Sequence, residues 1–262
     1  MRKLFLLFIV CMVQANIAQA QFVYLKSEYG FGIGGAQYFG DLNQGQKFNY
    51  IRQNAIFFYK KNFNPYVALK ATANYAFLGG NDKLNSSVYE QRRNLSFNSH
   101  IGELSLSGEF NFFRYAIGES ENRFTPYINF GLGAMYYNPY TIYRDQIVYL
   151  KPLGTEGQLY DQYKSRRYSN YAMVLPVGMG LKYWMTAGLT FSFEVSNRFT
   201  STDYLDDVST TYVGANLFPE SEPGSSTPDP GRILQDRSVE IGAPIGIAGR
   251  QRGTKSTRDQ YL

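Results

Sequence analysis

The sequence is poor in the residues that support thiol and disulfide chemistry. Of its 262 residues, one is cysteine, Cys11, and one is histidine, His100. Because Cys11 lies in an N-terminal segment that we expect to be removed, the mature chain would have no thiol for disulfides or catalysis. After that segment, no apolar run approaches the ~18 residues that a transmembrane helix needs. The 26 basic residues are scattered among 21 acidic ones, which argues against nucleic acid as the main partner.

The first 20 residues have the organisation of a cleaved secretory signal peptide. A basic start precedes an apolar stretch from Leu4 to Val13, and Ala18-Gln19-Ala20 forms a small-x-small cleavage site. Cys11 does not suit a lipoprotein anchor, because the bulky Val10 stands where that signal needs a small residue. We therefore expect residues 21–262 to form one exported domain.

The stretch from Ser99 to Tyr115 alternates apolar and polar side chains over an unusual length. Successive strand residues point to opposite faces. One face therefore carries Leu104, Leu106, Phe110 and Phe112, and the other carries Glu103, Ser105, Ser107, Glu109 and Asn111. Soluble strands typically have about five or six residues, whereas crossing a bilayer takes ~9 to 11. The length and the contrast between the faces favour a strand with lipid on one side and a wet interior on the other.

Seven segments of this kind are predicted strands, and most show the same alternation. They are Ser27–Gly40, Asn54–Asn62, Tyr66–Leu78, Ser99–Tyr115, Pro126–Tyr137, Tyr171–Trp184 and Ala187–Arg198. Glycines and other small residues occupy one face of several of them, which suits a narrow barrel whose interior just accommodates side chains.

The connections between these segments alternate strictly between short and long. Those after the second, fourth and sixth strands are short, whereas those after the first, third, fifth and seventh are long, the last covering about residues 200–258. Outer-membrane barrels have short periplasmic turns and long outer loops, while a β-sandwich has no reason to sort its loops in this way. We expect a barrel whose mature N-terminus is periplasmic. Aromatic residues near the strand ends would form two girdles: Phe112, Phe113, Tyr115, Phe124 and Tyr127 on the periplasmic side, and Tyr136, Tyr137, Tyr140 and Tyr143 outside.

Strand parity directs five charged side chains into the predicted lumen. They are Lys70, Glu103, Glu109, Lys182 and Glu194. Charges enclosed by a low-dielectric wall should form pairs, and a narrow interior crossed by such pairs is filled rather than open. The functional alternative is a gated channel that uses these charges as a filter.

Few residues have a pattern that suggests chemistry. Ser99, His100 and Glu103 superficially resemble a hydrolase triad, but His100 shares the lipid face of the strand while Glu103 points inward. A loop with Asp203, Asp206 and Asp207 lacks the spacing and turn glycine of a calcium loop, so we interpret its carboxylates as helix-capping or loop-ordering. We predict no catalytic, cofactor-binding or metal-binding residue.

Six segments, in order along nearly all of the mature chain, have a familiar composition. They are Gly34–Asn43, Ser99–Leu106, Phe124–Gly133, Leu175–Tyr183, Thr202–Val208 and Gly242–Gly249. Together they resemble the PorG-like outer-membrane barrel family of the Bacteroidetes type IX secretion and gliding machinery. The resemblance implies a non-enzymatic, eight-stranded barrel. It also implies binding to outer-membrane lipid and to periplasmic ring proteins of PorK and PorN type, with the secretion translocon as a further partner.

The sequence departs from this family at its end. Family members finish with an aromatic-rich closing strand, whereas this sequence stops at Arg258–Leu262, where that strand should begin. Seven strands would leave two edges of unpaired backbone groups in lipid, and bacterial barrels of this kind have even strand numbers. We therefore expect a C-terminally incomplete sequence and a gap between the first and seventh strands.

Taken together, the sequence predicts an all-β, antiparallel transmembrane barrel in the bacterial outer membrane. The resemblance further implies that it links the periplasmic ring complex of type IX secretion to that membrane. The alternative is an independent small barrel that acts as a channel or an adhesin. A lipid-modifying barrel enzyme would depend on His100 and is disfavoured by the strand parity.

Overall fold

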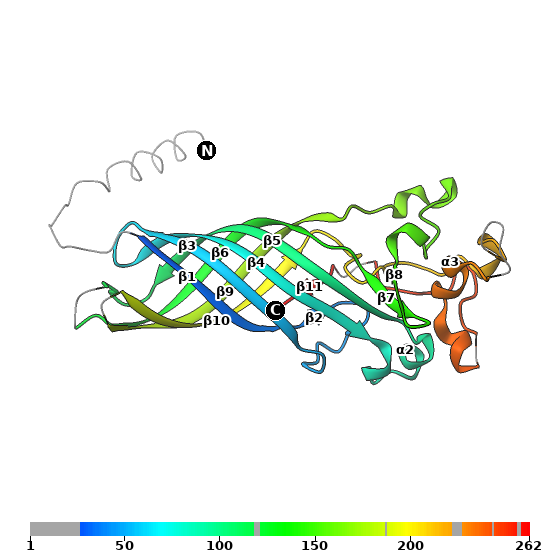
Figure 1. The fold of residues 1–262 in the computed structure, drawn as a ribbon, viewed down its shortest axis with the longest axis horizontal. Helices are drawn as coiled ribbons and strands as arrows, with labels where there is room; N and C mark the ends of the chain where they lie inside the picture. The colour runs from blue at the N-terminus through cyan, green and yellow to red at the C-terminus, as the bar shows by residue number, and fades with distance from the viewer. Residues whose placement is uncertain (1–26, 118–120, 187, 222–226, 243, 256–257) are drawn as a thin grey trace, which may run out of the picture.

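The protein is all-β, and its strands form one antiparallel sheet that curves into a nearly closed barrel (Figure 1). The predicted fold class is confirmed. The computed structural model describes residues 27–117, 121–186, 188–221, 227–242, 244–255 and 258–262, so the predicted signal peptide, residues 1–20, lies outside the described residues. Among the described residues, no helix has the length and apolar character needed to cross a membrane.

Seven long strands form the wall, and each pairs with the next along the chain. They are β1 (Ser27–Ala36), β3 (Arg52–Asn62), β4 (Val67–Asn81), β5 (Ser96–Asn111), β6 (Phe124–Tyr136), β9 (Tyr171–Thr186) and β10 (Leu189–Thr200). They match the seven predicted segments. The last turn was misplaced at Met185 and Thr186, which belong to β9; the turn contains Gly188, whose φ of 84° favours glycine.

The two ends of the barrel differ in the length of their connections (Figure 1). At the short-turn end lie the links β3–β4, β5–β6 and β9–β10; at the long-loop end lie the others. The long connections contain helices η1 (Asp82–Leu84), α2 (Val88–Arg93), η2 (Lys151–Leu153), η3 (Asp161–Arg166), η4 (Ala215–Leu217), α3 (Pro230–Leu234) and η5 (Arg237–Ile241). The predicted alternation of short and long connections is therefore present.

A small hairpin in the β6–β9 connection was not predicted. It consists of β7 (Tyr140–Tyr143) and β8 (Gln146–Tyr149), and β7 extends the sheet by pairing with β5. Its two turn residues, Arg144 and Asp145, have φ values of 50° and 60°. Two-residue turns with positive φ usually carry Asn-Gly or Asp-Gly, so this sequence gave no recognisable turn signal.

The ring closes only at the long-loop end, through the last residues of the chain. Strand β11 (Gln260–Tyr261) pairs with β10 on one side and with the short β2 (Tyr38–Phe39) on the other. The backbones of Gln37 and Leu262 also exchange two hydrogen bonds, of 3.1 and 2.9 Å. The expectation that no closing strand forms before Leu262 was therefore wrong, because both neighbouring edges offer pairing partners there. Below this point, β1 pairs only with β3 among the described strands, which is the predicted gap.

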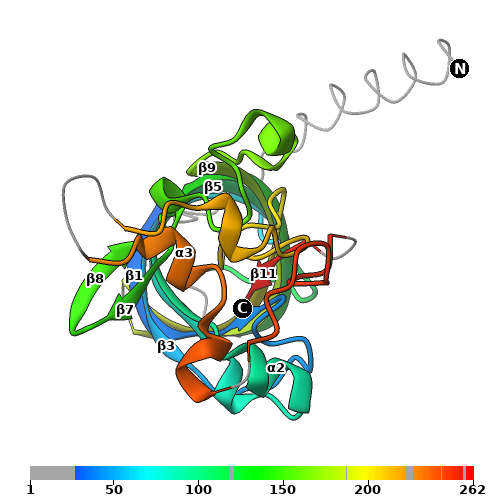
Figure 2. The same ribbon diagram turned by 90° about the vertical axis from the view of Figure 1, so that its right-hand side faces the viewer.

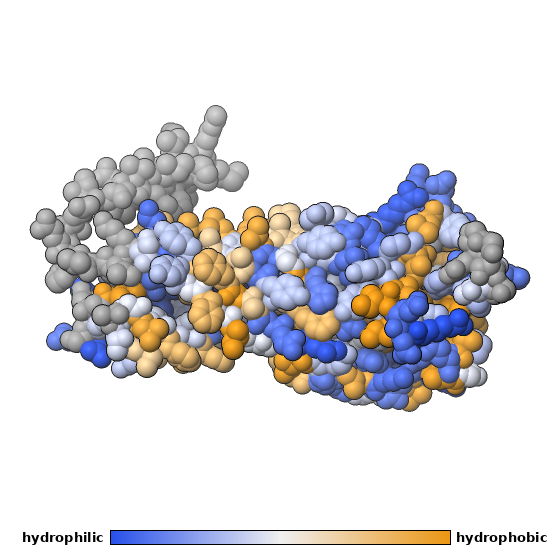
Figure 3. Space-filling model, in the orientation of Figure 1, coloured by the Kyte–Doolittle hydropathy of each residue, from blue (hydrophilic) through white to orange (hydrophobic). Residues whose placement is uncertain are grey.

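The outward face of the wall carries a belt of exposed apolar side chains over the short-turn half, which we call the belt. Its members include Leu104 (68% exposed), Phe130 (63%) and Phe191 (65%). Figure 3 shows apolar side chains gathered on the barrel half and a more hydrophilic surface at the long-loop end. Of the predicted girdle residues, Tyr115, Tyr127 and Tyr137 instead point inward and are buried, each with a polar partner for its hydroxyl.

The apolar core lies at the long-loop end. The segment after β10, described over 201–221, 227–242 and 244–255, folds across the mouth of the barrel, and we call it the cap (Figure 2). Leu205, Val208 and Leu234 of the cap pack into one cluster with barrel residues such as Leu78 and Phe97. At the opposite end, the β5–β6 turn contributes Tyr115 and Ile117 to a smaller cluster with Trp184. Both ends of the interior are therefore filled by packed side chains.

Candidate functional site

The interior of the short-turn half contains a buried cluster of charged side chains centred on Glu109. Lys60 of β3 lies 3.0 Å from one carboxylate oxygen of Glu109, and Lys182 of β9 contacts the other. All three side chains are at least nine-tenths buried. One carboxylate from β5 thus joins strands on two other sides of the barrel.

Two further ion pairs continue the cluster along the barrel axis. Lys70 lies 2.6 Å from Glu194, which also accepts a hydrogen bond of 2.8 Å from the hydroxyl of Tyr127. Nearer the long-loop end, Arg198 lies 2.9 Å from Glu103. The same oxygen of Glu103 accepts hydrogen bonds from Asn74 (3.1 Å) and from Tyr261 (2.7 Å), the residue that closes the ring.

All five predicted lumen residues therefore lie inside the wall, and each has a partner of opposite charge. Their direct partners Lys60 and Arg198 were not among the predicted residues. Strand parity could have found both, because Lys60 shares a face with Phe58 and Arg198 shares one with Glu194 and Ser196.

Glycines let bulky side chains fill the remaining space. A Cβ atom added at Gly180 would lie 2.6 Å from the ring of Tyr127, which passes over Gly180 to reach Glu194 two strands away. A Cβ atom at Gly178 would lie 2.9 Å from both Asn129 and Ser196. Paired charges, close packing and two filled ends make the described interior a largely solid core, in which Oε1 of Glu103 and Nδ2 of Asn129 remain buried without a hydrogen-bond partner.

The three predicted loop aspartates accept hydrogen bonds from three different places: Asp206 from strand β2, Asp207 from the β8–β9 connection, and Asp203 from within the cap itself. Asp206 accepts hydrogen bonds from the hydroxyl of Tyr38 (2.7 Å) and the backbone of Val208 (2.9 Å). Asp207 accepts from Tyr168 (2.6 Å) and from Thr155. Asp203 accepts a hydrogen bond of 2.6 Å from Ser209. These contacts order the loop, and in the part of the chain that the structure describes no group of His, Cys, Asp or Glu is arranged to hold a metal ion.

A second acid, Asp259, joins Asp206 at the hydroxyl of Tyr38. The hydroxyl oxygen lies 2.7 Å from Asp206 and 2.8 Å from Asp259, and all three residues are almost completely buried. A hydroxyl has one proton to donate, so the second contact requires a protonated carboxyl. Burial raises the pKa of Asp206 and of Asp259 well above the usual value, and the proximity of further aspartates raises each pKa more. This carboxyl pair was not predicted, because its members are 53 residues apart.

Two fully buried arginines tie the long connections to one another. Arg93 pairs with Asp82 (2.7 Å) and donates to the backbone carbonyls of Asp41 (2.7 Å) and Arg252. Arg252 in turn pairs with Glu156 (3.1 Å) and donates to the carbonyl of Asp207 (2.7 Å). Nothing in the local sequence marked these arginines, because their partners come from loops far apart in the chain.

His100 lies on the outside of the wall, as strand parity predicted. Its ring stacks on Phe77, with centroids 4.7 Å apart, and its Nδ1 lies 2.8 Å from the hydroxyl of Tyr75. Glu103 is inside the barrel, and the hydroxyl of Ser99 is buried and accepts a hydrogen bond from the backbone of Asn138. The three residues therefore do not form a hydrolase triad.

These features define a small antiparallel β-barrel with a charge-paired, filled interior, an apolar outer belt and a capped mouth. The chain belongs to the family described as a domain of unknown function (DUF6089), whose model matches residues 2–213. No curated protein and no solved structure matches the chain. The matched region includes all seven long strands and the aspartate loop.

Proposed function

We propose that this protein is a non-enzymatic outer-membrane barrel that links the periplasmic ring complex of the type IX secretion and gliding machinery to the outer membrane. The observation that supports it most directly is the filled barrel interior. A barrel that has an apolar outer belt but a solid core is suited to anchoring and poorly suited to transport. The resemblance of six segments to the PorG-like family supplies the identity of the machinery.

The apolar belt supports the location in a membrane. Exposed apolar side chains alternate with buried polar ones along β4, β5, β6 and β9, which is the pattern of strands that separate lipid from an interior. In bacterial barrels the short turns are periplasmic and the long loops are outside. This orientation would put the start of β1 on the periplasmic side, where the mature N-terminus would meet the ring.

The segments that resemble the PorG-like family contact one another in the fold. Tyr38, from Gly34–Asn43, donates to Asp206, from Thr202–Val208. Ser99–Leu106 pairs with Phe124–Gly133 in the sheet, and Phe124–Gly133 pairs in turn with Leu175–Tyr183. The resemblance therefore concerns residues that build one structural unit, rather than unrelated stretches of similar composition.

Affinity purification from native outer membranes, followed by mass spectrometry, tests the proposal. A tagged full chain should co-purify with ring proteins of PorK and PorN type. Exchanging the β3–β4 turn, residues 63–66, for an unrelated four-residue turn should reduce this recovery, because that turn faces the periplasm. The matched control exchanges Arg144 and Asp145 at the tip of the β7–β8 hairpin, on the opposite side of the membrane.

Recovery of the barrel without ring proteins would contradict the proposal. If such a barrel also gave channel currents in planar bilayers, the protein would be an independent channel. Ligand binding by the outer loops without ring proteins would favour the adhesin.

A further inference from the structure

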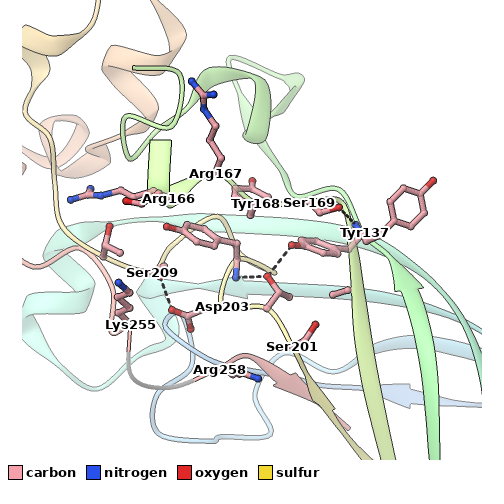
Figure 4. A pocket seen from close by; sticks show the side chains of 16 residues that line it. Tyr137, Arg166, Arg167, Tyr168, Ser169, Ser201, Asp203, Ser209, Lys255 and Arg258 are labelled. Carbon is pink, nitrogen blue, oxygen red and sulfur yellow. Dashed lines mark hydrogen bonds between the residues drawn. The ribbon is translucent and has the colours of Figure 1, made fainter. Parts of the chain in front are cut away.

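A cleft of about 660 Å³ opens at the long-loop end, beside the cap (Figure 4). One wall is residues 165–169, which lead from η3 into β9, and the other wall comes from residues 201–204 and 209–210 at the start of the cap. Lys255 and Arg258 complete the lining. The volume is in the range of small-molecule sites in proteins.

The cleft has an excess of positive charge. Its lining contains Arg166, Lys255 and Arg258 but one acidic side chain, Asp203; the guanidinium of Arg167 points away from the cleft and lies 3.8 Å from Asp161 (Figure 4). Arg166 is held in place by bonds to the backbone carbonyl (2.8 Å) and hydroxyl (2.9 Å) of Thr211. Within the described chain, neither Lys255 nor Arg258 donates a hydrogen bond to a neighbouring residue. An anionic group in the cleft would gain charge-assisted hydrogen bonds that the protein itself does not supply.

Asp203 adds a requirement for hydroxyl groups. One of its carboxylate oxygens accepts from Ser209 (2.6 Å), while the other is buried and has no hydrogen-bond partner among the described residues. A buried acceptor without a donor is costly. A ligand that brings a hydroxyl to this oxygen would remove that cost, so the favoured ligand is both anionic and rich in hydroxyls.

The rest of the lining also suits a sugar. Tyr137, Tyr168 and Tyr204 form a continuous stack, with ring centroids 6.3 and 4.6 Å apart. Serine and threonine hydroxyls surround them, and Ala172 is the one aliphatic side chain in the described lining. Tyr137 is completely buried and Tyr168 lies between the other two rings, so the stack supports the lining; the surface offers hydrogen bonds but no pocket for a large apolar group.

The cleft is continuous with the apolar outer wall. Ser201 of the cleft donates a backbone hydrogen bond of 2.9 Å to Met173, which is 55% exposed on the outward face of β9. Tyr171, which lines the cleft, and Phe199 of β10 are also exposed there. A molecule with a polar head in the cleft could therefore lay an apolar tail along the wall.

We propose that this cleft binds an acidic saccharide, phosphorylated or carboxylated, of the kind that forms the headgroup of an outer-leaflet glycolipid. The proposal of a saccharide site is argued from the cleft alone. The proposal that a glycolipid supplies the saccharide rests on the proposed outer-membrane location.

Binding to the full chain, purified in detergent, tests the proposal by calorimetry. The probes are a soluble phosphorylated core oligosaccharide of lipopolysaccharide, the same oligosaccharide after phosphatase treatment, and inorganic phosphate. The double variant Lys255→Gln and Arg258→Gln should bind the phosphorylated oligosaccharide at least about tenfold more weakly, because two charge-assisted bonds are lost. The matched control is Lys164→Gln with Arg250→Gln, which removes the same charge from exposed positions outside the cleft.

Equal binding by the double variant and the parent would overturn the saccharide site. If the phosphatase-treated oligosaccharide binds as tightly as the phosphorylated one, the ligand need not be acidic. If inorganic phosphate binds as tightly, the ligand need not be a sugar. Vesicles that contain lipopolysaccharide distinguish the source: if the double variant binds them as well as the parent does, the ligand is not a membrane headgroup. Co-purification of ring proteins is measured in a separate experiment. A cleft that binds no saccharide would therefore not contradict the proposed function.

Discussion

The short-turn half of the barrel and its long-loop end both bury charged side chains, but they compensate those charges differently. In the short-turn half, Lys60, Lys70 and Lys182 meet the carboxylates of Glu109 and Glu194 inside the lumen. At the long-loop end, Asp206 and Asp259 share one tyrosine hydroxyl, and the guanidinium of Arg93 binds backbone carbonyls as well as Asp82.

The difference follows from the local architecture. Regular strands offer no unpaired backbone groups to a lumen, so a buried charge there needs another side chain. Loops expose carbonyls and N–H groups that side chains can bind. Buried charges are therefore compensated by ion pairs in the short-turn half, and by protonation of carboxyls and by backbone contacts at the long-loop end. For this reason the stability of the two regions should respond differently to mutation and pH.

The largest effect should come from removing the shared acid of the short-turn half. The change Glu109→Ala leaves Lys60 and Lys182 buried without their partner, which should cost about 3–5 kcal/mol of unfolding free energy. Heat-induced mobility shifts on gels would measure it, with Glu194→Ala as a second case and the exposed Glu121→Ala as control. Solute permeability should not rise, because Tyr127 and Asn129 still fill the lumen. A large rise in permeability would show that the charges gate a channel.

At the long-loop end, a comparable loss should remain local. The change Arg93→Met leaves Asp82 unpaired and frees two backbone carbonyls, at a cost of about 3 kcal/mol. Because the wall strands do not depend on Arg93, we expect trypsin to cleave the cap while the barrel stays resistant. The neighbouring exposed residue provides the control Arg92→Met. Simultaneous loss of cap and barrel would show that the two regions are one cooperative unit.

The pH dependence should distinguish the two regions more directly. Burial raises the pKa of Asp207 to about 6 and that of Asp203 to about 7, and it raises the pKa of Asp206 and Asp259 as well. An acid whose pKa is higher in the folded state binds more protons when folded. Its favourable contribution is therefore present at low pH and is lost as pH rises from about 4 through the folded-state value.

We thus expect the protection of cap amides against hydrogen exchange, relative to an unfolded chain, to fall between about pH 4 and 7. The protection of β4 and β5 should change less. The variant Asp206→Asn should flatten this dependence, because one titrating group is removed. The variant Tyr38→Phe should weaken the cap by about 1–3 kcal/mol through loss of the shared donor. A cap that becomes more protected as pH rises would contradict the assigned protonation.

Most of what could be predicted about the barrel half followed from strand parity. Because side chains alternate with period two, the inward direction of Lys70, Glu103 and Glu109 followed from sequence, and so did the outward direction of His100. The same rule would have found Lys60. Parity describes one strand at a time, however, so it did not reveal that Lys60 and Lys182 converge on one acid.

The long-loop end was poorly predicted for a physical reason. Its contacts join residues far apart in sequence, such as Tyr38 with Asp259 and Arg93 with Arg252. No short-range period links such residues, and the tight β7–β8 turn uses Arg144 and Asp145 instead of a typical turn pair. The closing strand β11 was missed because two residues are too few to show alternation.

The smallest effect is expected on the outer wall, which belongs to neither buried region. The change His100→Ala removes stacking on Phe77 and the contact with Tyr75, and should cost about 0.5–1.5 kcal/mol. Since the ring is exposed and Glu103 is inside the barrel, the lipid A mass spectrum of cells that carry this variant should match that of the parent. A changed spectrum would mean that the aromatic cluster around His100 performs chemistry on lipid. The buried groups of the two regions lie inside the wall and could not reach a lipid outside it.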